Sequence, residues 1–291
     1  MKNRILPYLI AFIIVAAFTN CQLNTHVLIP INQSKKNISA SKKEDVIAKR
    51  NNKEDADRMF FQSISQHEIP VLCYHQVREW KATDSKTART YIIPPLRFMQ
   101  HMKILADSGY HFVLPQDIAD YIKNKNKPPR KSCMISFDDG TEGQYTTALP
   151  VLNTYGFKGV FFIMTVVLNK PGYLTKEQVI DVSKHGHVIA CHTWDHHNVT
   201  GYTEKDWQLQ LQQPTAALEK MIRKPVNFFA YPNGIWNSHA ISDLKKQGYT
   251  AAFQLAEKQD VNEPAFTIRR IIADSHWSGP QLIQAMEKAF K

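Results

Sequence analysis

The sequence predicts an α/β fold, a distorted (β/α) barrel of about seven parallel strands with outer helices. Three observations predict it. Short apolar runs alternate with amphipathic segments, the apolar runs are nearly continuous, and about seven such units follow one another after residue 69. Nearly continuous apolar strands are typical of parallel sheets that helices cover. A chain of 291 residues with 43% hydrophobic content can bury one sizeable core of this kind.

The expected strands are rich in Val, Ile, Phe and Tyr. They span residues 69–74, 132–137, 159–165, 187–193, 226–231, 250–255 and 267–273. Between them, amphipathic helices are expected at residues 94–110, 176–186 and 237–249. Several of these segments end in a Gly before the next strand, as helices with a glycine C-cap do. Pro150 and Pro214 fall within helical patterns and should kink or restart those helices.

The first 66 residues are expected to lie outside this barrel. In residues 1–20, two basic residues precede an apolar run that is short for a membrane span, which predicts a lipoprotein-type signal peptide. A true transmembrane anchor is the alternative. Cys21 follows directly and resembles the lipidation site of bacterial lipoproteins, although the preceding "FTN" lacks the usual small residue. Residues 21–66 are polar and predict a tether, and residues 67–291 form the folded domain.

These features predict an exported protein of the bacterial cell envelope, on the periplasmic or the outer surface, that a lipid on Cys21 anchors to the membrane. The net charge of +10 would suit an anionic partner, but Lys and Arg are spread along the chain without a basic and aromatic stripe. No nucleic-acid partner is therefore expected, and the protein is expected to be a monomer. Cys73, Cys133 and Cys191 each lie in an apolar run and are expected to be buried free thiols.

Polar side chains follow several of the expected strands. They are His75, Asp138, Asp139, His192, His196, Tyr231 and Asn233. A single such residue is usually a cap or a solvated loop residue. In a parallel barrel, however, the carboxyl ends of the strands form one active face, so this many ligand-type residues at equivalent places favour a catalytic site there.

The segment "HTWDHHN" holds two imidazoles four residues apart, at His192 and His196, which can converge on one ion. One carboxylate would complete a set of two histidines and one carboxylate that leaves coordination positions open. A divalent cation also offsets the repulsion between the adjacent Asp138 and Asp139, one of which can bind it while the other stays free. His197 is the alternative second imidazole. Zn is the first choice of metal, and Co, Ni or Fe would also accept these ligands.

The runs "SFDDG" (136–140) and "HTWDH" (192–196) resemble the signature motifs of the polysaccharide deacetylases of carbohydrate esterase family four. The early "YH" of "VLCYHQV" is similar to the branch that deacetylates poly-N-acetylglucosamine. The resemblance implies that residues 67–291 are a catalytic domain with Asp138 as the general base and His75 as the catalytic acid. It also implies that Asp139, His192 and His196 hold the metal.

The third motif of that family, Arg-x-Pro-Tyr, is altered here to "AYPNG" at residues 230–234. Ala230 stands where the arginine that orients the base would be. Arg269 or Arg270 is expected to take over that task, with Arg270 preferred. By the same resemblance, the substrate-binding residues are Tyr231, Pro232 and Asn233.

The expected activity is a metal-dependent removal of N-acetyl groups from a polysaccharide that contains N-acetylglucosamine. A metal-bound water would attack the acetamide carbonyl, Asp138 would take its proton, and His75 would protonate the departing amine. The alternatives are an O-acetyl esterase on a plant or envelope glycan and a non-catalytic glycan-binding relative. A glycosidase fits poorly because two adjacent aspartates cannot flank a scissile bond, and no glycine-rich phosphate cradle favours a phosphoesterase.

Overall fold

The computed structural model describes residues 49, 50, 55, 68–255 and 257–290. The expected signal peptide, Cys21 and nearly all of the expected tether lie outside the described residues and stay predictions. None of the described helices is long and apolar enough to cross a membrane. The folded part belongs to one compact unit that spans Lys53–Lys291.

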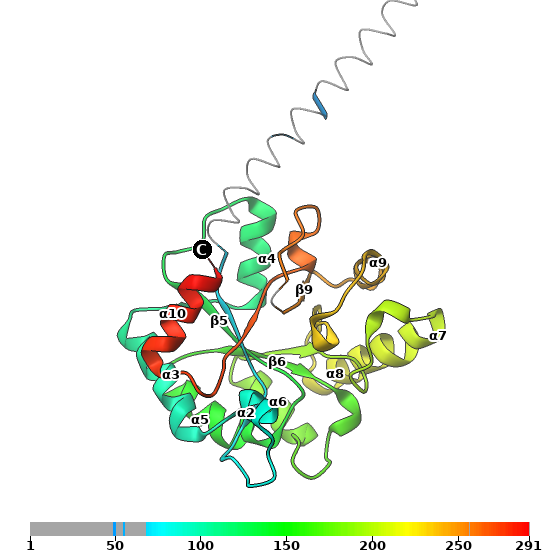
Figure 1. Cartoon of the computed structure of the whole chain (residues 1–291). Helices are drawn as coiled ribbons and strands as arrows, with labels where there is room; N and C mark the ends of the chain where they lie inside the picture. The colour runs from blue at the N-terminus through cyan, green and yellow to red at the C-terminus, as the bar shows by residue number, and fades with distance from the viewer. Residues whose placement is uncertain (1–48, 51–54, 56–67, 256, 291) are drawn as a thin grey trace, which may run out of the picture. The chain divides into compact units, whose positions relative to one another are not determined.

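A parallel sheet runs through the centre of this unit, with helices around it (Figure 1). Its strands lie in the order β10-β1-β5-β6-β7-β8-β9, and every neighbouring pair is parallel. Their bounds are β1 (Val71–Tyr74), β5 (Ser132–Phe137), β6 (Gly159–Ile163), β7 (Val188–Cys191), β8 (Phe228–Ala230), β9 (Ala251–Phe253) and β10 (Ile271–Ile272). The seven strands are those expected from the sequence, and the predicted fold class is confirmed.

The two edges of the curled sheet approach each other through the segment that leads into β10. Ile271 pairs with Leu72 of β1, while Ile268, three residues earlier, forms a parallel bridge to Phe253 of β9. Two backbone hydrogen bonds support this bridge, from Gln254 N to the Ile268 carbonyl and from Ile268 N to the Ala252 carbonyl. One short stretch of chain therefore closes the barrel.

Three further strands are only two residues long. β2 (Gln76–Val77) and β3 (Ile92–Ile93) form a separate small sheet, and β4 (His111–Phe112) pairs with the start of β5. The sequence analysis did not predict them, because two residues are too few to show a periodic pattern.

The helices cover the outer face of the strands. The α-helices are α2 (Lys86–Tyr91), α3 (Pro95–Asp107), α4 (Pro115–Asn124), α5 (Leu149–Thr154), α6 (Lys176–Lys184), α7 (Glu204–Trp207), α8 (Gln213–Ile222), α9 (Ser238–Lys246) and α10 (Gly279–Ala289). The shorter turns are the π-helices η1 (Gln144–Ala148) and η4 (Gln208–Gln212) and the 3₁₀ turns η2 (Thr165–Val167), η3 (Val199–Gly201), η5 (Pro232–Gly234) and η6 (Pro264–Phe266). Pro150 and Pro214 each occupy the second position of an α-helix directly after a π-helical turn, so both restart a helix as expected.

Alternate residues of each strand face opposite sides of the sheet. In β5, Ile135 and Phe137 belong to the apolar layer that includes the helix residues Phe98 and Met102, whereas Met134 belongs to the other buried cluster. This alternation places the residue after the strand, Asp138, on the same side as Met134. The three cysteines of the sheet are free and buried, as predicted.

Candidate active site

The two adjacent aspartates leave the end of β5 in different environments. Asp138 is almost completely buried, and its backbone N–H donates a hydrogen bond of 2.9 Å to the Tyr74 carbonyl of β1. Asp139 has a left-handed backbone with φ of 73°, and its side chain is 24% exposed. The reversed backbone after Asp138 separates the two carboxylates, so each has partners of its own.

Asp139, His192 and His196 form a group whose potential ligand atoms all lie within 4.8 Å of one another. Asp139 Oδ1 lies 3.7 Å from His192 Nε2 and 3.9 Å from His196 Nε2. The Nδ1 of His192 lies 2.8 Å from the Ala230 carbonyl and therefore carries the proton, which leaves the lone pair on Nε2. That Nε2 is buried without a hydrogen-bond partner among the described residues. An orphaned acceptor beside a carboxylate and a second imidazole fits a divalent metal ion.

The electrostatics of this group also suit a cation. Burial lowers the pKa of His192 to about 4 and also lowers that of His196, so both rings are neutral at pH 7, the form that binds metal. Burial raises the pKa of Asp139 to about 6. No Lys or Arg in the described part of the chain forms an ion pair with Asp139, so a bound cation would supply the missing positive charge.

Asp138 is held by a buried arginine. Arg270 places Nη1 2.6 Å from Oδ1 and Nη2 2.8 Å from Oδ2, while its Nε donates to the Gln254 carbonyl at 3.1 Å. Burial acts to raise the pKa of Asp138, but the guanidinium overrides this effect and holds the pKa well below its usual range. The Sγ of Cys73 lies 3.5 Å from the same carboxylate. Asp138 is therefore ionised at any ordinary pH.

His75 follows β1, and its position is fixed through its backbone. The His75 carbonyl accepts hydrogen bonds from the Thr141 hydroxyl at 3.0 Å and from Gln144 Nε2 at 2.8 Å. Gln144 Nε2 also lies 2.5 Å from the Asp138 carbonyl. The buried carboxamide thus links the backbones of His75 and Asp138. The His75 ring packs edge-on against Tyr91, with ring centroids 5.1 Å apart.

These groups surround one cavity of about 420 Å³. The predicted site residues that line it are His75, Asp138, Asp139, His196, Tyr231, Asn233 and Arg270. They come from strand ends and loops at one end of the barrel. The structure therefore brings together residues that lie up to 195 positions apart in the sequence, from His75 to Arg270.

His192 is buried and lies 3.7 Å from Asp139, but it does not itself line the cavity. Three other residues named from the sequence also lie outside it. His197 has a side chain that is 71% exposed, and its Nδ1 bonds Asp195 at 2.6 Å. Arg269 forms an ion pair of 2.8 Å with Glu68 instead of reaching Asp138. Pro232 is buried and does not line the cavity. Of the alternatives left open by the sequence, the geometry brings His196 and Arg270 into the site.

The altered third motif contributes Tyr231, Asn233 and Gly234 to the lining of the cavity. The hydroxyl of Tyr231 donates a hydrogen bond of 3.0 Å to the buried Phe266 carbonyl, so its proton is not available to a ligand. Asn233 is exposed and has a left-handed backbone with φ of 57°. The next residue, Gly234, has φ of 72°, and a Cβ there would lie 2.7 Å from Leu255 N, so this turn requires glycine.

Left-handed backbone conformations gather at the site. Of the non-glycine residues with positive φ, Asp139, Thr193, His196 and Asn233 all belong to the loops that build it. Such conformations cost of order 1–3 kcal/mol each and persist where surrounding contacts enforce them. The motif spacing did not reveal this feature. It explains how the loop from Thr193 to His196 coils back so that two imidazoles approach one carboxylate.

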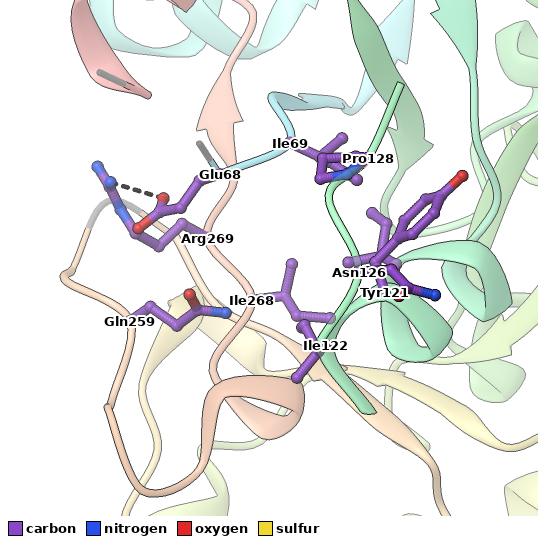
Figure 2. A pocket seen from close by; sticks show the side chains of 10 residues that line it. Glu68, Ile69, Tyr121, Ile122, Asn126, Pro128, Gln259, Ile268 and Arg269 are labelled. Atoms are coloured by element: carbon purple, nitrogen blue, oxygen red, sulfur yellow. Dashed lines mark hydrogen bonds and ion pairs between the residues drawn. The ribbon is translucent and has the colours of Figure 1, made fainter. Parts of the chain in front are cut away.

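A separate and much smaller cavity lies at the opposite end of the barrel, where the chain enters β1 and β10 (Figure 2). It holds about 40 Å³, room for a few water molecules. Its two charged residues, Glu68 and Arg269, are joined to each other, and apolar residues of α4 line another side. With no uncompensated charge, it lacks the chemistry of the larger cavity.

The polysaccharide deacetylase family model matches residues 125–252. YxkH of Bacillus subtilis (strain 168), which is named as a polysaccharide deacetylase, is 28% identical over 197 residues, 68% of each chain. The poly-beta-1,6-N-acetyl-D-glucosamine N-deacetylase of Staphylococcus aureus (strain MRSA252) is 26% identical over 210 residues, 65% of this chain and 72% of that protein.

Solved structures share the fold. The Streptococcus pyogenes deacetylase PplD, in complex with acetate, superposes with a TM-score of 0.69 at 23% identity, over 75% of this chain and 98% of that one. IcaB from Ammonifex degensii has a TM-score of 0.62 at 25% identity, over 77% of this chain and 97% of that one.

Proposed function

Because the chain belongs to the polysaccharide deacetylase family, we propose that it is a metal-dependent hydrolase that removes N-acetyl groups from a polysaccharide containing N-acetylglucosamine. One observation carries the proposal. A metal-type group of one carboxylate and two imidazoles lies beside a second carboxylate that is kept ionised by a buried arginine, with His75 on the same cavity. The pattern of residues 1–21 further supports an exported, lipid-anchored protein of the cell envelope.

Asp139, His192 and His196 would hold the metal. When bound, a divalent ion acts as a Lewis acid that lowers the pKa of water toward about 7 and polarises an amide carbonyl. The hydrogen bond from His192 Nδ1 to the Ala230 carbonyl fixes the ring and its tautomer for this role. Neutral nitrogen ligands and one carboxylate suit Zn, with Co, Ni and Fe as alternatives.

Asp138 is the general base in this proposal. Its carboxylate accepts a proton from the attacking water, which adds to the acetamide carbon to give a tetrahedral oxyanion. The two hydrogen bonds from Arg270 keep the carboxylate charged and fix its orientation, as the arginine of the family's third motif would. A positioned base contributes typically 10²- to 10⁴-fold to the rate.

His75 is the catalytic acid. It donates a proton to the sugar nitrogen as the carbon–nitrogen bond breaks, which gives acetate and a glucosamine residue. A backbone N–H near Asn233, which lines the same cavity, stabilises the oxyanion. The early position of the acid in the chain and the likeness to the Staphylococcus aureus enzyme favour poly-β-1,6-N-acetylglucosamine as the polymer.

The test is acetate release from a panel of glycans: poly-β-1,6-N-acetylglucosamine, peptidoglycan, chitin oligomers and acetylated xylan. We expect acetate from the first, loss of activity on chelation, and recovery when Zn, Co, Ni or Fe is restored. An Asp138→Asn variant should retain the metal but lose about 10²- to 10⁴-fold in kcat.

Each part of the proposal has its own contrary result. Acetate from xylan alone would show an O-acetyl esterase. Glycan binding without acetate from any polymer, in protein shown to contain metal, would favour a non-catalytic binding protein. Full activity of the Asp138→Asn variant would refute the assignment of the base.

A further inference from the structure

A second cavity, of about 550 Å³, adjoins the catalytic one. Gln76 of β2, the residue after His75, lines both cavities. The other walls come from the loop after β2, the loop 141–143 that follows the two aspartates, and Tyr173. A hollow surface therefore extends from the catalytic group toward the side of β2 and η1, which suits a polymer better than a single sugar.

Hydrogen bonds and close packing join the walls of this cavity to one another and to the segment that carries His75. Glu142 N donates to the Gly172 carbonyl at 3.0 Å, and Thr141 forms an antiparallel bridge with Tyr173. The Thr141 hydroxyl bonds the His75 carbonyl. A Cβ on Gly143 would lie 2.1 Å from the carbonyl oxygen of Val77 in β2, so the loop packs directly on that strand. The cavity is thus a fixed part of the fold.

The charges that line this cavity differ from those of the chain as a whole. Glu79 and Glu142 are exposed, and neither forms an ion pair with a described residue. The guanidinium of Arg78 is already paired with Asp84 at 2.8 Å, which leaves Lys81 as the uncompensated cation here. With Arg78 neutralised by Asp84, which lies outside the lining, the two glutamates outnumber the remaining cation by one, in a chain of net charge +10.

The cavity also offers groups that suit a sugar ring. Tyr173 is half-buried, and its hydroxyl has no hydrogen-bond partner among the described residues; the same holds for the hydroxyl of Thr147. An aromatic ring can pack on the apolar face of a pyranose while hydroxyls and carboxylates bind its polar edge. A carboxylate binds an ammonium group more strongly than a neutral acetamide.

We infer that the second cavity is a subsite for a neighbouring sugar of the polymer, and that it prefers a residue whose amine is already free. Glu142 accepts hydrogen bonds from the ammonium group of that residue. This inference rests on the proposed function, since the reaction itself generates such residues. Each deacetylated sugar that moves into the subsite favours reaction at its neighbour, so free amines accumulate in clusters along the chain.

The test compares two β-1,6-linked N-acetylglucosamine hexamers, one fully acetylated and one with a single free amine. We expect the wild-type protein to favour the second hexamer in kcat/KM by roughly two- to fivefold at low salt, the range of an exposed ion pair. Glu142→Gln should abolish this preference, so that the two hexamers react with equal kcat/KM. The matched control is Glu287→Gln, on the exposed face of α10 at the other end of the barrel, which should behave as wild type.

An equal preference in the wild type and the Glu142→Gln variant, or an equal loss in the Glu287→Gln control, would overturn the subsite. Failure of the proposed function is distinguishable, because then neither hexamer releases acetate. Calorimetric titration with a glucosamine hexamer decides the subsite in that case. A two- to fivefold loss of affinity in the Glu142→Gln variant supports it, and unchanged affinity refutes it.

Discussion

The guanidinium of Arg270 donates two hydrogen bonds, of 2.6 and 2.8 Å, one to each carboxylate oxygen of Asp138, and both side chains are buried. Each group neutralises the buried charge of the other. Two ions removed from water are stable only when they are well paired, and removal of one partner leaves an uncompensated buried charge.

Replacement of Arg270 by Met should therefore lower both stability and activity. We expect the free energy of unfolding to fall by about 3–5 kcal/mol at pH 7, because the buried Asp138 loses its counter-charge. The remaining folded protein should also lose kcat, since the base is no longer held in place. Urea unfolding and acetate release measure the two effects.

The matched control is the double variant Arg270→Met with Asp138→Asn, which removes both charges. It should recover most of the lost stability but none of the activity. A double variant as unstable as the single one would mean that Arg270 contributes through packing on Phe162, 5.1 Å from its ring, rather than through Asp138.

His196 and His197 are adjacent in the sequence but only His196 approaches Asp139. His196→Ala should reduce zinc affinity by at least about tenfold, because even outer-shell partners of a metal contribute 10- to 100-fold. His197→Ala should retain the metal. Competition with a chelator, followed by metal analysis, measures both variants. Loss of metal in the His197 variant alone would show that the loop presents the other imidazole.

Gln144 is a buried side chain that joins the backbones of His75 and Asp138. Gln144→Met keeps the size of the side chain but removes its donor from the Asp138 carbonyl and leaves the His75 carbonyl with only the Thr141 hydroxyl, which costs about 1–3 kcal/mol. We expect kcat to fall with KM nearly unchanged, because the acid and base lose their mutual alignment while the cavity walls remain. Gln144→Asn, which keeps the donor, should recover part of kcat. Unchanged kcat in the Met variant would limit Gln144 to a role in folding.

The pH dependence of stability should reflect two buried histidines far from the metal-type group. His101 lies between the Tyr74 hydroxyl and the Trp277 carbonyl, and His187 Nδ1 accepts from Gly159 N–H. Burial lowers the pKa of each to about 4. The unfolded chain, with histidine pKa near 6.5, then binds more protons between these values, so stability is complete above about pH 6.5 and is lost as the pH falls toward 4.

We expect a loss of about 1–2 kcal/mol per histidine between pH 7 and pH 5, in urea unfolding of the chelated protein. His187→Gln should remove the contribution of His187 to this pH dependence of the free energy of unfolding. The exposed His185 is a suitable control, and His185→Gln should leave the slope unchanged. A flat profile in the wild-type protein would contradict a lowered pKa of these two histidines in the folded state.

The fold could be predicted from the sequence because each long strand carries a continuous apolar run. β5, for example, buries all six of its residues on two apolar layers. The two-residue strands β2 and β3 could not be predicted, since their pairing depends on the fold around them. The predicted strands were also too long: within the run 267–273 only Ile271 and Ile272 form a strand, since the chain pairs with β1 there and makes a single bridge to β9 at Ile268.

The members of the site were predictable from residue type and spacing, but their partners were not. Arg269 and Arg270 are chemically identical neighbours, and only the geometry separates the one that contacts Glu68 from the one that contacts Asp138. Gln144 gave no signal, because an isolated glutamine after a strand is usually solvated. Tyr91, which is 41% exposed and packs beside His75, could not be recognised either, because it belongs to a short helix without a buried face.

The stretch from Ile268 to Ile272 closes the barrel and also carries Arg270, which keeps Asp138 ionised. Its bridge to β9 is a single residue pair, which is weak compared with the long pairing of β1 and β5. If this bridge breaks, Arg270 separates from the Asp138 carboxylate while the rest of the sheet is still intact. Warming or mild denaturant should then abolish catalytic activity before the protein unfolds globally. The pairing between Ile268 and Phe253 would thus limit the temperature up to which the protein is active.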